Sequence, residues 1–75
     1  MHKGDVDAAI ARYQDALRLN AYYAKARLLL AGAYEKKGDR TRALECYQQY
    51  LKMFPDGHDV SKVRKKIEKL SHSKS

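Results

Sequence analysis

Two stretches of this chain repeat each other at a fixed spacing of 34 residues, with no gap in the alignment. Gly4-Asp5 returns as Gly38-Asp39, and Tyr13-Gln14 returns as Tyr47-Gln48. Ala9, Ile10 and Leu17 keep the same register with Ala43, Leu44 and Leu51. A repeat of this length indicates one supersecondary unit stacked on another copy of itself. Such stacks usually present a binding surface rather than a catalytic pocket.

The chain has 75 residues, which is enough for one small domain or part of one. Cys46 is the only cysteine, so no disulfide can form within the chain, and we expect it to pack in a helix. The three histidines are scattered and no pair has metal-ligand spacing on a helix, so we expect no metal site and no cofactor.

The net charge is +7, and the excess is greatest in residues 57–75, which carry six basic and two acidic residues. This imbalance favours an acidic partner or surface. We expect no membrane span, because no apolar run approaches the length that one needs. The N-terminal residues lack the apolar segment of a signal peptide, so the expected compartment is the cytoplasm by default.

The periodicity predicts an all-α fold with four helices, and no segment alternates like a strand. Turn residues separate the helices at Gly4-Asp5, Gly38-Asp39 and Pro55-Asp56-Gly57. Gly38 is expected to end the second helix in the left-handed region, and Asp39 to cap the third. The predicted helical ranges are 5–19, 21–37, 40–53 and 59–70, and residues 72–75 are predicted to form a frayed tail.

Apolar side chains follow one face of each predicted helix. Ala9 and Ala43 are small residues that would let two helices cross closely, while Tyr13 and Tyr47 would fill the wider space beyond the crossing. The core residues predicted for the second helix are Ala26, Leu29, Leu30, Ala33 and Tyr34. Those predicted for the third helix are Ala43, Leu44, Tyr47, Tyr50, Leu51 and Phe54.

Residues 24–57 resemble one full tetratricopeptide repeat, whose pattern is W-x2-L-G-x2-Y, A-x3-F and P. The matching positions are Leu30, Tyr34, Ala43, Tyr47 and Pro55. The departures are Arg27 in place of the aromatic, Ala31 in place of glycine and bulky Tyr50 in place of alanine. Residues 4–20 match the second helix of a preceding repeat, and residues 58–71 resemble a lysine-rich capping helix.

The resemblance implies a right-handed solenoid of antiparallel helical hairpins and a role in protein–protein interaction. It also implies that the first helix lacks its own partner, either because the chain comes from a longer array or because another chain covers it. Homo-oligomer formation through this helix is therefore one hypothesis. The predicted self-association edge consists of Val6, Ile10, Tyr13 and Leu17.

First helices line the concave groove in this family, which implies a groove that binds a peptide or a partner helix. The predicted groove residues are Lys25, Leu28, Leu29, Gly32, Glu35, Lys36, Lys62, Lys66 and Lys69. Lysines beside leucines suit an acidic, partly apolar peptide. Some members hold acidic chaperone tails with a clamp of Lys, Asn and Arg. Lys25 fits that clamp, but Leu29 and Gly32 do not.

The predicted function is thus a non-catalytic interaction module or scaffold. One alternative is a basic module that binds nucleic acid or an anionic surface through Arg64-Lys65-Lys66. The predicted helix that carries these residues has no aromatic side chain for base stacking, so nucleic acid is the less favoured partner. Another alternative is an excised or engineered repeat scaffold without a function of its own. An enzyme is not expected, because the sequence has no phosphate loop and no nucleophile beside a base.

Overall fold

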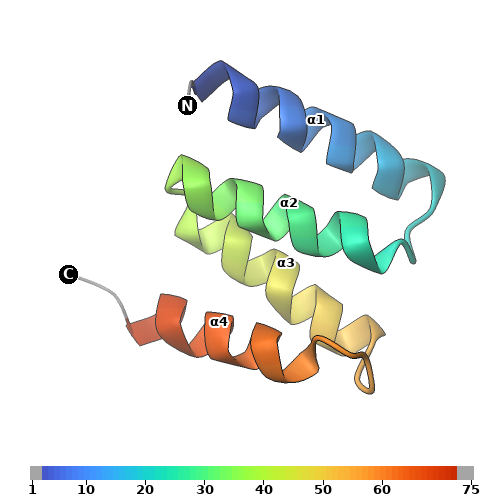
Figure 1. Cartoon of the computed structure of the whole chain (residues 1–75), viewed down its shortest axis with the longest axis vertical. Coiled ribbons are helices and arrows are strands. Elements are labelled where there is room, and N and C mark those ends of the chain that lie inside the picture. Colours follow the sequence, from blue (N-terminus) through green and yellow to red (C-terminus); the bar gives the residue numbers. More distant parts are fainter. Residues whose placement is uncertain (1–2, 73–75) are drawn as a thin grey trace.

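Four helices make up the computed structural model, which describes residues 3–72 (Figure 1). They are α1 (Lys3–Leu19), α2 (Ala24–Lys37), α3 (Arg40–Met53) and α4 (Val60–His72). No strand occurs among these residues, which confirms the predicted all-α class. The end of the predicted tail, residues 73–75, lies outside the described part of the chain.

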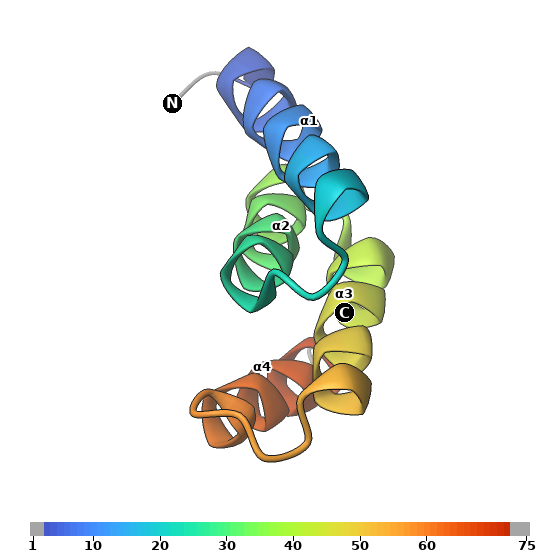
Figure 2. The same cartoon turned by 90° about the vertical axis from the view of Figure 1, so that its right-hand side faces the viewer.

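The helices pack in the order of the sequence: α1 on α2, α2 on α3, and α3 on α4. Within the described range, no two helices that are apart in this order bring their Cα atoms within 8 Å. In Figure 2, α2 and α4 lie on one side of the stack, and α1 and α3 lie on the other. The Cα atoms extend over 36 × 32 × 16 Å, so the molecule is a slab two helix layers thick.

The turn between α2 and α3 has the predicted local chemistry. Gly38 adopts φ 89° and ψ 9°, in the left-handed region where a Cβ is strained. The N–H of Asp39 donates to the carbonyl of Tyr34 at 2.9 Å, and that of Gly38 donates to Glu35 at 3.0 Å. The Asp39 carboxylate then accepts from the N–H of Arg42 at 3.2 Å. Together these bonds end one helix and start the next.

The boundaries of three helices differ from the prediction. Helix α2 begins at Ala24 rather than at residue 21, because the Asn20 side chain accepts a hydrogen bond from the Tyr22 N–H at 3.0 Å and forms a turn. Helix α1 begins at Lys3. Helix α4 begins at Val60 and continues to His72, so the first residue of the predicted tail is helical.

The core has small residues at the crossing of α2 and α3 and tyrosines around it. Ala31 and Ala43 are completely buried, and Tyr34, Tyr47 and Tyr50 are buried beside them. Leu29 was expected in this core, but 43% of its surface is exposed. Its neighbour Leu30 takes the core position instead, since adjacent residues on a helix point about 100° apart.

Helix α1 buries most of its apolar stripe without another chain. Val6 and Ile10 are in the hydrophobic core, and Tyr13 and Leu17 are half-buried against it. These are the four residues of the predicted self-association edge. They are buried or half-buried where α1 packs on α2, and self-association through them stays a prediction. The periodicity identified the apolar face of α1 correctly, but it did not show that α2 alone covers this face.

Candidate partner-binding groove

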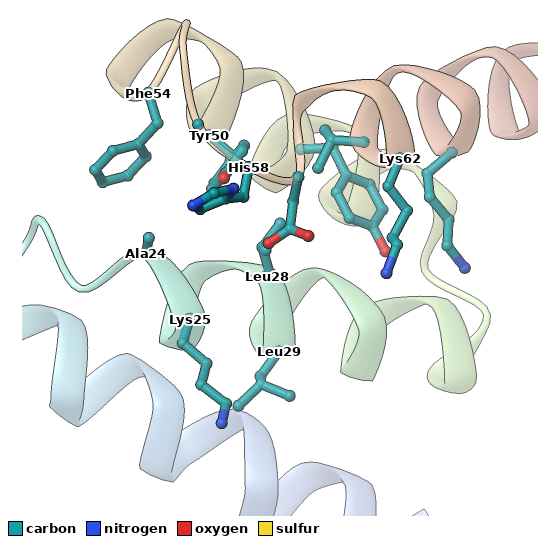
Figure 3. A pocket seen from close by; sticks show the side chains of 13 residues that line it. Ala24, Lys25, Leu28, Leu29, Tyr50, Phe54, His58 and Lys62 are labelled. Atoms are coloured by element: carbon teal, nitrogen blue, oxygen red, sulfur yellow. The ribbon is translucent and has the colours of Figure 1, made fainter.

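A hollow of about 600 Å³ lies between α2 and α4 on the concave side of the stack (Figure 3). Helix α3 forms its floor, and the turn between α3 and α4 closes one end. Its lining residues are Ala24, Lys25, Leu28 and Leu29 of α2; Tyr47, Tyr50 and Phe54 of α3 and its cap; Gly57, His58 and Asp59 of the turn; and Lys62, Val63 and Lys66 of α4.

A second hollow of about 450 Å³ continues the concave surface towards α1. It shares four residues with the first hollow, namely Leu28, Leu29, Tyr47 and Lys66. The others come from α1 and the C-terminal half of α2: Asp5, Val6, Ala9, Tyr13, Gly32, Ala33, Glu35 and Lys36. We call the two hollows together the concave groove.

Every groove residue predicted from the sequence lines one of the two hollows, with the exception of Lys69. Lys69 is exposed one turn beyond Lys66 on α4 and lies outside both. Lys62 reaches from α4 towards α2, across the hollow from Leu28 (Figure 3). The predicted positions are therefore mostly brought together by the fold.

The sequence analysis missed the floor of the groove and its closed end. The rings of Tyr50 and Phe54 pack at a tilt of 39° with centroids 5.2 Å apart, and His58 lies beside Tyr50 (Figure 3). A Cβ at Gly57 would lie 2.6 Å from the Tyr50 hydroxyl, so the absence of a side chain lets this turn close over the tyrosine. The spacing of Tyr47, Tyr50 and Phe54 at i, i+3 and i+7 was the available signal for an aromatic floor.

The groove lysines differ in their electrostatic partners. Lys66 Nζ lies 3.6 Å from Glu35 Oε1, and the Tyr47 hydroxyl donates to the same oxygen at 3.0 Å. In contrast, Lys25, Lys36 and Lys62 have no carboxylate within 4.0 Å in the described part of the chain. The positive charge of these three lysines is therefore not compensated by a carboxylate at contact distance.

Burial raises the pKa of the Tyr47 hydroxyl well above its ordinary value of 10.0, and the Glu35 carboxylate raises it further. Because the pKa of this hydroxyl is higher in the folded than in the unfolded state, its protonated form stabilises the fold below about pH 10. This stabilisation is lost as the pH rises from about 10 through the folded-state pKa. At neutral pH, Tyr47→Phe should be less stable than the wild type by about 1 kcal/mol, because one hydrogen bond is lost. Above about pH 10 this difference should shrink and then reverse.

Urea denaturation of Tyr47→Phe and the wild type across this pH range measures the difference directly. Tyr22→Phe is the matched control, because it removes an exposed tyrosine hydroxyl. A stability difference between Tyr47→Phe and the wild type that stays constant with pH would contradict the assignment.

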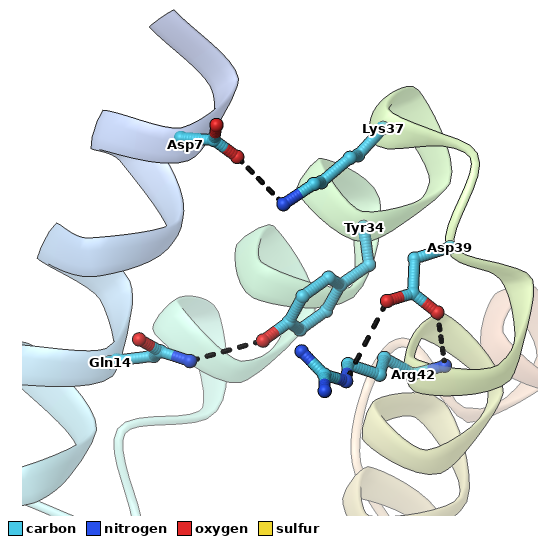
Figure 4. A network of polar contacts seen from close by, with 6 residues as sticks. All are labelled: Asp7, Gln14, Tyr34, Lys37, Asp39 and Arg42. Atoms are coloured by element: carbon cyan, nitrogen blue, oxygen red, sulfur yellow. Dashed lines mark hydrogen bonds and ion pairs between the residues drawn. The ribbon is translucent and has the colours of Figure 1, made fainter. Parts of the chain in front are cut away.

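A separate polar network joins α1 to the α2–α3 turn (Figure 4). Lys37 Nζ lies 2.9 Å from Asp7 Oδ1, and hydrogen bonding to this carboxylate raises the pKa of Lys37. Gln14 Nε2 donates to the Tyr34 hydroxyl at 3.0 Å. These contacts join α1 to α2, and none of the four residues lines either hollow.

Comparison with known families agrees with the fold and the spacing. A tetratricopeptide repeat family model matches residues 1–67. The chain belongs to the tetratricopeptide repeat family. The matched range runs into α4 as far as Ile67. No curated protein sequence and no solved structure matches the chain significantly.

Tetratricopeptide repeats generally mediate protein–protein interaction, and the family is typically non-catalytic. The predicted family and the predicted class of helical repeat are thus confirmed. None of the helices that the structure describes is long and apolar enough to cross a membrane.

Proposed function

We propose that this tetratricopeptide repeat domain binds a peptide segment of a protein partner in its concave groove, and that the segment carries both apolar and acidic side chains. The observation that carries the proposal is the position of Leu29. This large apolar side chain remains 43% exposed inside a hollow whose rim carries Lys25 and Lys62.

The size and the floor of the groove support a peptide as the ligand. A volume of about 600 Å³ falls within the range of pockets that hold small ligands or a few side chains. The floor is aromatic, with Tyr50 and Phe54 of α3 and its cap, and Leu28 on the α2 wall adds apolar surface beside it. Apolar side chains of a ligand would lose water on this floor, and that loss supplies most of the binding free energy.

The charge at the rim supports an acidic ligand. Lys25 and Lys62 lie on opposite walls of the hollow, on α2 and α4, and neither has a carboxylate partner among the described residues. Exposed charges at the rim of an interface mainly raise the association rate and make binding sensitive to salt. We therefore propose that the lysines orient the peptide and raise its association rate, and that the floor supplies the larger part of the affinity.

Calorimetric titration of the domain with a short peptide of alternating leucine and glutamate tests this assignment. Leu29→Ala should weaken binding about fivefold or more, as expected for an apolar anchor in an interface. Leu19→Ala is the matched control, because Leu19 is 90% exposed and lies outside both hollows. Its affinity for the peptide should equal that of the wild type.

Charge reversal separates the groove from the general basicity of the chain. Lys62→Glu should weaken peptide binding and reduce its salt dependence, whereas Arg64→Glu, on the same helix but outside the groove, should change it less. Equal effects of the two variants would contradict groove binding. Tight binding of a DNA duplex with steep salt dependence, together with no peptide binding, would favour the nucleic-acid alternative instead.

A further inference from the structure

An ion pair crosses the concave groove where its two hollows meet. Lys66 comes from α4 and Glu35 from α2, and their charged atoms lie 3.6 Å apart. Lys66 lines both hollows, and Glu35 lines the second. The Tyr47 hydroxyl rises from the floor and donates to the same Glu35 oxygen at 3.0 Å. The three side chains thus form a bridge from wall to wall over the floor of the groove.

This bridge divides the groove into regions of different charge. Glu35 has two partners, yet 24% of its side chain remains exposed, so its carboxylate is accessible to a ligand. Because it neutralises Lys66, the cations that remain near the α3–α4 turn are Lys25 and Lys62. A ligand therefore meets two unpaired lysines and one carboxylate, Asp59, at the closed end of the groove, for a net positive charge, and the Glu35 carboxylate in its middle.

We infer that Glu35 sets the charge selectivity of the groove: it keeps Lys66 from acidic ligands and disfavours an acidic side chain at the middle of a bound peptide. The inference rests on the proposed function, because it concerns the peptide that the groove would bind. A ligand that fits would place acidic residues near Lys25 and Lys62 and an uncharged residue over the bridge.

The physical reason is the balance between two carboxylates that compete for one ammonium group. A ligand carboxylate near Lys66 would meet Glu35 at short range, and like charges in a partly desolvated groove repel. The ion pair itself is partly exposed and therefore weak, so the bridge can open when Glu35 is neutralised. Lys66 would then become a third free cation on the wall of α4.

The test compares two peptides, one of alternating leucine and glutamate and one with glutamine in place of every glutamate. The ratio of their dissociation constants measures the preference of the groove for acidic ligands. Glu35→Gln retains an oxygen that can accept from Tyr47 but removes the charge. It should raise the preference for the acidic peptide about fivefold over the wild type.

Glu45→Gln is the matched control, since it removes the same charge from an exposed position of α3 outside both hollows. Its preference ratio should stay close to that of the wild type. If Glu35→Gln changes the ratio no more than Glu45→Gln does, the inference is wrong. The proposed function would still stand in that case, provided that the wild type binds the acidic peptide. If the wild type binds neither peptide, the proposed function fails and this inference fails with it.

Lys66→Gln provides a second and independent measurement. In the wild type this substitution should weaken binding of the acidic peptide less than Lys62→Gln does, because Lys66 is already neutralised. In the Glu35→Gln background it should weaken binding about fivefold, and a double-mutant cycle measures this coupling. An equal loss for Lys66→Gln and Lys62→Gln in the wild type would overturn the inference even if Glu35→Gln failed to fold.

Discussion

Tyr34→Ala should lower the free energy of unfolding by about 3–5 kcal/mol, the range for the loss of a large aromatic side chain from a core. Tyr34 is buried, its hydroxyl accepts a hydrogen bond from Gln14 of α1, and the Arg42 guanidinium of α3 lies 6.0 Å from its ring (Figure 4). A domain of 75 residues has a total stability of about 4–11 kcal/mol, so this loss is a large fraction of the stability of the domain. Urea denaturation followed by circular dichroism measures the change.

Tyr34→Phe separates the ring of Tyr34 from its hydroxyl. It keeps the packing and removes only the hydrogen bond from Gln14, so it should destabilise by about 1 kcal/mol. A similar loss for the two variants would mean that the ring adds little to the core.

Val63→Asp should detach α4 from the rest of the domain. Val63 of α4 is only 2% exposed and belongs to the hydrophobic core. A carboxylate without a partner at this position would cost about 3–5 kcal/mol. Because the backbone of α4 packs on α3 alone and only a partly exposed ion pair joins α4 to α2, we expect local loss of α4 while the first three helices keep their structure. Amide hydrogen exchange, measured peptide by peptide, should increase strongly in α4.

The same variant tests the groove, because Lys62 and Lys66 leave with α4. Peptide binding should be lost together with the protection of α4. Ser61→Asp is the control, as this neighbouring residue is exposed and can carry a charge in water. Exchange that rises equally over all four helices in Val63→Asp would show that α4 is not a separately stable unit.

Features that depend on neighbouring residues in the chain were predictable from the sequence. Gly38 and Asp39 form the expected turn because its hydrogen bonds join residues only a few positions apart. The start of α2 was missed for a similarly local reason, since helical periodicity does not reveal the side-chain turn at Asn20. The predicted end of α3 is right because Pro55 restricts the backbone before it.

Features that depend on how helices meet were harder to predict. Periodicity showed that Val6 and Ile10 belong to the apolar face of α1, but not that α2 alone would bury them. It also grouped Leu29 with Leu30, although the two point to different surfaces. The resemblance to the family located the walls of the groove. It gave no information on the aromatic floor or on the bridge from Glu35 to Lys66, because these contacts join three helices.

The packing of each helix only on its neighbours in sequence has a consequence for folding. Backbone packing between helices joins only neighbours in the sequence, so most contacts close a loop no longer than one hairpin and form at a small entropic cost at each step, while the Glu35–Lys66 ion pair spans a longer loop from α2 to α4. Folding can begin in any adjacent pair and spread outwards. Helices α2 and α3 each have two neighbours, whereas α1 and α4 have one. Among the described helices, α2 and α3 are therefore held from two sides, whereas α4, which forms one wall of the groove, has backbone packing on one side only.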